Sequence, residues 1–179
     1  MIVNNYDDIA YELEGFITEF ETSTLLNVAK KSNDWSPNRE DFWTNRIAEI
    51  YENPEAKEIL DNIHARVENL FSSFSGINRF EAISRFFAGD SMPAHYDEVG
   101  HPEIAFGIII YLNDEYSGGE IFYPDNNIKI KPKAGSLVMH SGSIFHQVTE
   151  VAGSTRYFMT TFVHGNNSSP AKLRSFEDL

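Results

Sequence analysis

Hydrophobic positions recur with two different periods along the chain, and the change falls near Gly76. Before this point, apolar residues recur every three or four positions, which is typical of helices that bury one face. After it, short alternating or wholly apolar runs are separated by glycine-rich turns, which is typical of strands. The first half is therefore predicted to be mainly helical and the second half to be β-sheet.

Two helices are predicted in the first half. The first follows Thr18, which with Glu21 forms the pattern of a capping box. The second is predicted over about residues 54–74, with Asn53 as its N-cap and the glycine at the change of period as its stop. Its apolar face consists of Ala56, Ile59, Ile63, Val67, Leu70 and Phe74. A short strand over residues 11–17 is expected before both helices.

Seven strands are predicted in the second half, over residues 80–87, 104–112, 120–123, 127–131, 136–140, 147–151 and 156–163. Short strands with regular turns indicate a sandwich or a jelly-roll, cupin-like barrel, with the N-terminal helices against one sheet. We expect an α+β, mainly β fold with a single domain over 1–165. Its helical buttress is expected over about 1–78 and its barrel over about 79–163, with 166–179 as a loose tail.

Composition and charge narrow the chemistry that this barrel can carry. The 179 residues include no cysteine, which excludes disulfides, thiolate metal sites and a cysteine nucleophile. The formal net charge of -13 repels phosphate, so neither nucleic acid nor an anionic membrane is an expected partner. The first residues lack a basic and apolar signal segment, and no apolar run is long enough to cross a bilayer. The expected location is therefore cytoplasmic.

The candidate chemistry begins with His95 and Asp97. Residues two apart in a strand point to the same side, so this imidazole and this carboxylate can bind one metal ion together. His146 follows near another predicted strand and adds a second imidazole. Two neutral imidazoles and one carboxylate are the ligand set of non-haem Fe(II) oxygenases and leave three cis positions open. Zinc accepts the same donors, although the chain has no HExxH segment of a zinc hydrolase.

The other four histidines are assigned no ligand role. His64 lies within the second predicted helix, while His140 and His164 lie near strand ends without a partner motif. All three are expected to be structural. His101 follows His95 in a loop and either lines the mouth of the site or lies on the surface, the latter being the simpler expectation.

Arg156 begins the last predicted strand, ten residues after His146. A guanidinium inside a barrel is costly unless an anion pairs with it. Since a guanidinium binds a carboxylate through two parallel hydrogen bonds, a metal-chelating co-substrate with a distal carboxylate would satisfy it. 2-Oxoglutarate has this shape. Taken alone, Arg156 would be assigned to an ordinary surface salt bridge, and the neighbouring metal-ligand set favours the anion anchor.

These residues, in this order, resemble the 2-oxoglutarate/Fe(II) dioxygenases, most closely their prolyl 4-hydroxylase-like branch. The resemblance covers roughly residues 80–163. Its segments are Phe87-Ala-Gly-Asp-Ser-Met-Pro-Ala-His-Tyr-Asp97, Ile110-Tyr-Leu-Asn-Asp114, Gly118-Gly-Glu-Ile-Phe-Tyr-Pro124, Pro132-Lys-Ala-Gly-Ser-Leu137 and His146-Gln-Val-x-x-Val-x-x-Gly-x-x-Arg-Tyr157. It implies a double-stranded β-helix with helices packed on the major sheet.

The resemblance also implies roles for individual residues. The implied iron ligands are His95, Asp97 and His146. Arg156 is the implied partner of the distal carboxylate of 2-oxoglutarate, and Tyr111 is similar to a family tyrosine that hydrogen-bonds the same group. A core aromatic is the alternative for Tyr111. Thr160, on the same strand face as Arg156, is expected to contribute its hydroxyl. The implied cofactors are Fe(II), 2-oxoglutarate and O2, with ascorbate as an optional reductant.

Two features depart from the family pattern. Phe86 and Phe87 stand where many relatives have a tyrosine, and Met92 replaces a frequent aromatic residue before the first iron histidine. These departures concern the identity of the substrate and leave the iron chemistry unchanged. Trp35, Trp43, Arg39 and Arg46 lie in a loop-rich segment that is either a substrate lid or, as we expect, packed on the core.

The implied activity is hydroxylation of a C–H bond with release of succinate and CO2. By resemblance, the substrate is a prolyl residue of a peptide or protein, as for procollagen-proline-type dioxygenases. A free amino acid or another side chain is the first alternative. Alkylated nucleic acid is disfavoured by the net charge and by Ala152 and Phe158, where such demethylases carry arginine. Halogenation is disfavoured because Asp97 is retained, and a non-enzymatic jelly-roll binding module is the remaining alternative.

Overall fold

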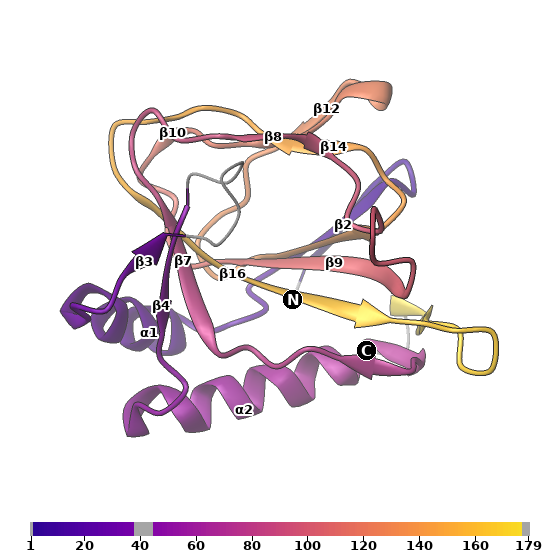
Figure 1. Cartoon of the computed structure of the whole chain (residues 1–179), viewed down its shortest axis with the longest axis horizontal. Coiled ribbons are helices and arrows are strands. Elements are labelled where there is room, and N and C mark those ends of the chain that lie inside the picture. Colours follow the sequence, from indigo (N-terminus) through magenta and orange to yellow (C-terminus); the bar gives the residue numbers. More distant parts are fainter. Residues whose placement is uncertain (1, 38–44, 177–179) are drawn as a thin grey trace.

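The computed structural model describes residues 2–37 and 45–176. Figure 1 shows three layers, with a small sheet above a large sheet and two helices below the large sheet. The fold of the described residues is mainly β, as the sequence predicts. All strand pairs are antiparallel.

Within the described residues, the large sheet has nine strands. Their order is β1 (Ile2–Tyr6), β2 (Ala10–Glu14), β13 (Leu137–Ser141), β9 (Ile104–Tyr111), β16 (Arg156–His164), β7 (Ala82–Phe86), β4 (Arg46–Glu49) and β3 (Ser36–Pro37), with β6 (Gly76–Ile77) paired to β16. The small sheet has four strands in the order β12 (Ile128–Ile130), β11 (Ile121–Tyr123), β14 (His146–Val148) and β8 (Met92–His95). A one-turn 3-10 helix, η1 (Pro124–Asn126), joins β11 to β12.

Two further pairs of strands lie outside these sheets. They are β10 (Ser117–Gly118) with β15 (Val151–Ala152), and β5 (Phe71–Ser73) with β17 (Lys172–Leu173). From β7 onward the chain passes repeatedly between the two main sheets. It runs β7 in the large sheet, β8 in the small, β9 in the large, β11 and β12 in the small, β13 in the large, β14 in the small and β16 in the large. The two sheets are therefore interleaved along the sequence.

The helices begin where the capping signals predict. Helix α1 (Glu19–Lys31) has Thr18 as its N-cap, and the reciprocal bonds between Thr18 and Glu21 form the predicted capping box. Helix α2 (Pro54–Glu68) has Asn53 as its N-cap, whose side chain accepts a hydrogen bond from the backbone of Glu55. Each cap satisfies backbone N–H groups that a helix leaves unpaired in its first turn.

The helices and the large sheet share one hydrophobic core. Leu25 of α1 and Ile63 of α2 are fully buried against residues of the large sheet such as Ile110. Since alternate residues of a strand point to opposite faces, this core uses only the outer face of the sheet. The opposite face is free to line the space between the two sheets, where two smaller clusters surround Tyr111 and Phe86.

The second helix is shorter than predicted. It ends at Glu68 instead of continuing to about residue 74, and Gly76 lies in β6 instead of serving as the helix stop. The buried residues that continued the helical period instead form β5, which pairs with β17. A periodic pattern cannot reveal this pairing, because the partner strand lies about a hundred residues later in the chain.

The C-terminal segment also differs from expectation, since it is not a loose tail over its described part. The backbone N–H of Arg174 donates to the carbonyl of Leu70 at 2.8 Å, and the Phe176 ring lies 5.1 Å from that of Tyr11. These contacts dock the segment on the helix-side core. The domain boundaries at about 78 and 165 remain predictions, although the N-terminal half also contributes β1, β2, β3 and β4 to the large sheet.

The seven strands predicted after the change of period are confirmed, with bounds that differ by one to three residues. Strand β8, which carries His95, was not predicted. The strand expected over 11–17 is β2, and its partner β1 was not predicted. Within the described residues, neither helix combines the length and the apolar stretch needed to cross a bilayer.

We predict that Glu21→Ala destabilises the protein by about 1–2 kcal/mol. Besides the capping box, Glu21 accepts a hydrogen bond from Arg66 of α2 at 2.6 Å, so it ties the two helices together. Burial opposes its ionisation, but the bonds from Thr18 and the charge of Arg66 lower the pKa of Glu21 below 4.5. A lowered pKa stabilises the fold above the unfolded-state value and less as the pH falls through the folded-state value.

Urea unfolding of the metal-free protein measures the free energy of unfolding of Glu21→Ala and of the wild type. The difference between the two free energies should become smaller in acid, where Glu21 is protonated. The matched control is Glu19→Ala, which lies in the same helical turn but outside the capping box and is expected to change stability by less than about 0.5 kcal/mol. Equal effects of the two substitutions would contradict the assigned role of Glu21.

Candidate metal centre and anion pocket

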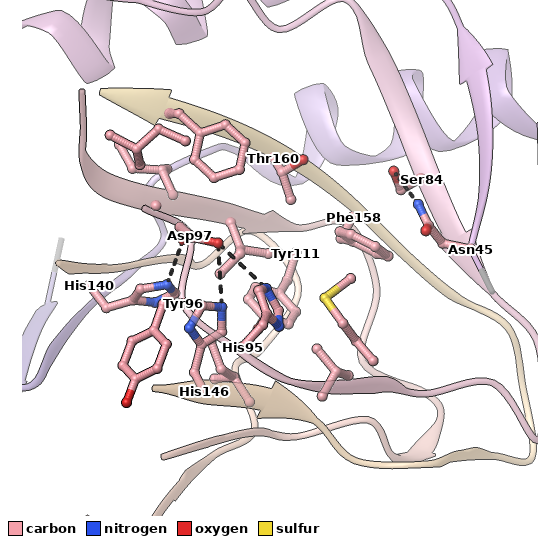
Figure 2. A pocket seen from close by; sticks show the side chains of 18 of the residues that line it. Asn45, Ser84, His95, Tyr96, Asp97, Tyr111, His140, His146, Phe158 and Thr160 are labelled. Carbon is pink, nitrogen blue, oxygen red and sulfur yellow. Dashed lines mark hydrogen bonds and ion pairs between the residues drawn. The ribbon is translucent and has the colours of Figure 1, made fainter. Parts of the chain in front are cut away.

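The space between the two sheets contains a cavity of about 370 Å³. Its wall includes residues from both sheets and most of the residues singled out in the sequence (Figure 2). These are His95, Asp97, Tyr111, His146, Arg156 and Thr160. The cavity therefore brings together side chains that lie more than sixty residues apart in the chain.

Three of them form a compact group of metal-binding atoms. One ligand atom from each of His95, Asp97 and His146 lies within 4.8 Å of the others. Oδ1 of Asp97 is 3.5 Å from Nε2 of His95 and 3.7 Å from Nε2 of His146. Strand pairing accounts for this geometry, because β14 and β8 place His146 directly opposite His95. Cross-strand neighbours have side chains close enough to share one ion.

Both imidazoles are oriented for metal binding. Nδ1 of His95 is 2.8 Å from the carbonyl oxygen of Pro93, and Nδ1 of His146 is 2.9 Å from that of Ile144. A carbonyl oxygen can only accept, so each Nδ1 carries the proton and each Nε2 presents its lone pair toward Asp97. Such outer hydrogen bonds commonly fix the tautomer of a metal-ligating histidine.

The electrostatics keep the carboxylate charged and one imidazole neutral. Burial opposes ionisation of Asp97, but the hydrogen bond from His140 and the neighbouring imidazoles of His95 and His146 hold the pKa of this carboxyl far below its usual range. Burial, reinforced by the neighbouring His140, lowers the pKa of His146 to about 3. Burial lowers the pKa of His95, but Asp97 and the carbonyl oxygen of Pro93 stabilise the protonated imidazole more strongly, so the net pKa is raised. An anionic oxygen beside a neutral imidazole is the state that binds a divalent cation.

Arg156 is buried in the same cavity, with 1% of its surface exposed. Its Nε and Nη1 have no hydrogen-bond partner among the described residues. Its guanidinium carbon lies 4.2 Å from the ring centroid of Phe158 and 4.9 Å from that of Tyr111. Aromatic faces compensate a buried cation only partly, so this guanidinium needs an anion.

Two buried phenols accompany this guanidinium. The hydroxyls of Tyr111 and Tyr116 also lack a hydrogen-bond partner in the described part of the chain. Burial raises the pKa of both phenols, that of Tyr116 to about 12, against the opposing charge of Arg156. Both hydroxyls therefore stay protonated and can donate. A cation and two donors without partners form a pocket suited to a carboxylate.

The structure shows why a glycine is needed at Gly119, in the Ser-Gly-Gly segment that precedes β11. Its φ is +64°, and a Cβ there would lie 3.0 Å from the Tyr116 ring and 3.1 Å from Cδ of Arg156. A side chain at this position would both strain the backbone and press on the anion pocket. The glycine thus allows the loop to close over Arg156.

Thr160 lies apart from the group around Arg156. It lines the cavity from β16, but its side chain is exposed and its strand partner is Ile109 (Figure 2). The partner of Phe158, nearer Arg156, is Tyr111. The expected contribution of the Thr160 hydroxyl to co-substrate binding therefore remains a prediction. Tyr116, in contrast, was not predicted from the sequence but lies beside the guanidinium of Arg156.

His140 is the other residue whose position the sequence did not reveal. It was expected to be structural, yet its Nε2 lies 3.2 Å from Oδ2 of Asp97 in the candidate metal centre. The one signal in the sequence was Gly107, a glycine within the apolar run that forms β9. In the structure, Gly107 is the register partner of His140 on β13. A strand glycine often marks a place where another group approaches closely.

The remaining singled-out residues lie away from this group or at its margin. His64 is paired with Glu68 on α2, and His164 lies 2.8 Å from the side chain of Asn78. His101 lines the mouth of the cavity.

Of the loop-rich segment, Trp35 packs at 6.2 Å from the Tyr157 ring and at 3.9 Å from the guanidinium of Arg85, in agreement with core packing. Arg46 begins β4. Trp43 and Arg39 lie outside the described residues.

Comparison with known protein families agrees with this arrangement. Residues 82–164, which contain all six predicted site residues, match the model of the 2OG-Fe(II) oxygenase superfamily. Over this stretch the chain is similar to the 2OG-Fe(II) oxygenases. The chain is also 24% identical over 148 residues to a PKHD-type hydroxylase of Maricaulis maris, a match that covers 75% of this chain and 68% of the relative.

Solved structures share the fold of this chain. A prolyl-4-hydroxylase of Pseudomonas putida superimposes with a TM-score of 0.70 at 18% identity, over 90% of this chain and 95% of that one. A prolyl hydroxylase of Trichoplax adhaerens, solved with a hypoxia inducible factor peptide fragment, gives 0.71 at 18% identity, over 88% and 84% of the two chains. The fold of this chain is thus prolyl hydroxylase-like.

The superfamily implies Fe(II), 2-oxoglutarate and O2, and the residues present fit the first two. The donor set of two imidazoles and one carboxylate suits Fe(II). The buried guanidinium without an anion, flanked by two phenols without partners, suits a carboxylate of 2-oxoglutarate.

We predict that Arg156→Met stabilises the ligand-free protein by about 1 kcal/mol or more, because it replaces a buried unpaired charge by an apolar side chain of similar length. The same variant should lose the additional stabilisation that 2-oxoglutarate gives to the Mn(II)-loaded protein. Thermal unfolding with and without these ligands measures both effects. As a matched control, Arg66→Met removes a paired guanidinium and should destabilise. If Arg156→Met instead destabilised the ligand-free protein as Arg66→Met does, the guanidinium would already have a partner within the protein.

Proposed function

We propose that this protein is an oxygenase that hydroxylates a prolyl residue of a peptide or protein, with Fe(II) held by His95, Asp97 and His146. The single observation that carries the proposal is that this metal-ligand set lines the same cavity as a buried guanidinium without an anion among the described residues. When bound, Fe(II) with 2-oxoglutarate and O2 supplies the oxidising power to convert a C–H bond to C–OH, with formation of succinate and CO2.

The residues of the chain bind and orient the reactants. The two imidazoles and Oδ1 of Asp97 would occupy one face of the ion and leave the other face for co-substrate and O2. Arg156 would form two hydrogen bonds with the distal carboxylate of 2-oxoglutarate, with Tyr111 and Tyr116 as further donors. Burial of this end between the sheets excludes water and strengthens these charge interactions.

The interleaved sheets support a double-stranded β-helix as the framework of the site. Of the ten strands from β7 to β16, eight are divided equally between the large and the small sheet, as the chain passes repeatedly from one to the other, while β10 and β15 pair with each other. A jelly roll has eight strands in two such sheets.

The lining of the cavity favours a residue within a peptide over a free amino acid. Apart from histidines, Asp97 and Arg156, the described lining residues are uncharged. Nothing among them would pair with the ammonium group and the carboxylate of a free amino acid, whose desolvation is costly. A prolyl ring is neutral and mainly apolar, as are the walls formed by Ile47, Ile104 and Phe162. The net charge of -13 also disfavours nucleic acid.

An apolar rim next to the metal ligands would accommodate the peptide. Val99 lines the cavity with 71% of its surface exposed, and Tyr96 is 40% exposed. The Tyr96 ring lies 4.9 Å from that of Phe145. Aromatic and aliphatic side chains at the mouth of a site are typical anchors for apolar groups of a ligand.

Ascorbate as a reductant and the cytoplasmic location remain predictions.

The proposal predicts hydroxylation of proline-containing peptides that requires both Fe(II) and 2-oxoglutarate. Mass spectrometry would detect the addition of one oxygen atom, and succinate would form in an equal amount. Peptides with alanine in place of proline, and free proline, test the substrate class. Asp97→Ala should reduce succinate formation to background because the carboxylate ligand is lost. His164→Ala, a histidine substitution outside the cavity, should retain activity.

Different results would contradict different parts of the proposal. Full activity of Asp97→Ala would remove this residue from the metal site. Succinate formation with a substrate other than proline would keep the oxygenase and reject the prolyl assignment. A wild-type protein whose melting temperature does not respond to Mn(II) and 2-oxoglutarate would favour a non-enzymatic binding module.

A further inference from the structure

A chain of three buried side chains runs outward from the candidate metal centre. The hydroxyl of Tyr123 lies 3.0 Å from Nδ1 of His140, and Nε2 of His140 lies 3.2 Å from Oδ2 of Asp97. Tyr123 and His140 are 0% and 2% exposed. Figure 2 shows His140 on the side of Asp97 away from Tyr111, with its contact to the carboxylate drawn as a dashed line.

The direction of each hydrogen bond follows from the donors available. An ionised carboxylate can only accept, so Nε2 of His140 carries the proton that it donates to Oδ2 of Asp97. In a neutral imidazole the other nitrogen is then an acceptor, and the O–H of Tyr123 is positioned to donate to it. The phenol thus holds His140 in the tautomer that serves the carboxylate.

This arrangement separates the two oxygens of Asp97. Oδ2 is bound to His140, whereas Oδ1 lies 3.5 Å and 3.7 Å from the Nε2 atoms of His95 and His146. A carboxylate held by one oxygen offers the other to an ion. His140 itself is not part of the group of ligand atoms within 4.8 Å of one another, among the residues that the structure describes.

We propose that His140 is a positioning residue that fixes Asp97 for metal binding through Oδ1, and that Tyr123 in turn fixes His140. The inference rests on the metal site of the proposed function. It adds two residues, from β13 and β11, that touch neither the ion nor the co-substrate and act through Asp97.

Gly107 gives independent support, because the hydrogen-bonded pair lies directly over it. A Cβ at this position would lie 2.2 Å from Oδ2 of Asp97 and 3.0 Å from Nε2 of His140. Its φ is outside the left-handed region, so the backbone itself would accept alanine. The absence of a side chain in the middle of the apolar strand β9 therefore provides space for this contact and is not required by backbone geometry.

The test measures the dissociation constant of Mn(II), by calorimetric titration without 2-oxoglutarate, together with the melting temperature of the metal-free protein. His140→Phe keeps an aromatic ring but removes the donor, and should raise the dissociation constant about 10- to 100-fold. His140→Gln keeps an N–H donor and should recover most of that loss. Tyr123→Phe should raise the constant about fivefold, as expected for one neutral hydrogen bond.

Gly107→Ala provides a second route to the same result without altering His140. The added methyl should displace Asp97 and weaken Mn(II) binding at least as much as His140→Phe. His164→Phe is the matched control, since it removes a histidine hydrogen bond to Asn78 outside the cavity and should leave the dissociation constant unchanged.

Two results would overturn the inference. One is an unchanged Mn(II) constant in both His140→Phe and Gly107→Ala. The other is an equal loss of binding in His140→Phe and His140→Gln that follows an equal fall in the metal-free melting temperature, since this would indicate packing alone. Failure of the proposed metal site is distinguishable, because Asp97→Ala would then bind Mn(II) like the wild type.

Discussion

The antiparallel pairing of β14 with β8 is the contact on which the candidate site depends. It places His146 opposite His95, and the chain that leaves β8 brings Asp97 back over the large sheet within reach of both. Because side chains alternate along a strand, a shift of one residue in this register would turn the imidazoles to opposite faces. The register of two short strands therefore decides whether a divalent ion can be bound at all.

The two faces of the large sheet have different roles: one packs against the helices and stabilises the fold, and the other lines the cavity. The outer face and both helices form an apolar core. The capping box of α1 and the ion pair between Glu21 and Arg66 add to its stability. The inner face carries Arg156 and lies opposite the metal-ligand set, where unpaired polar groups are tolerated. Such groups cost folding free energy until a ligand satisfies them, which is a common compromise at functional sites.

The metal-ligand set is supported by residues that make no contact with the ion themselves. Carbonyl groups orient His95 and His146, while His140 and Tyr123 orient Asp97, so each ligand has its own outer hydrogen bond. A preorganised site does not have to reorder its side chains when the ion binds, which favours affinity. This layer of contacts ties the small sheet to the large one across the cavity.

The sequence by itself determined the features that depend on local chemistry. Thr18 and Asn53 mark the helix starts, and His95, Asp97 and Arg156 were singled out by residue type and spacing and line one cavity. Asp97, however, lies in the turn after β8, so the strand alternation from which the sequence argument began does not apply to it. Only the tertiary structure decided the end of α2, the docking of the C-terminal segment and the roles of His140 and Tyr116. The partners of these elements lie far away in the chain, and neither periodicity nor motif spacing carries information about such pairings.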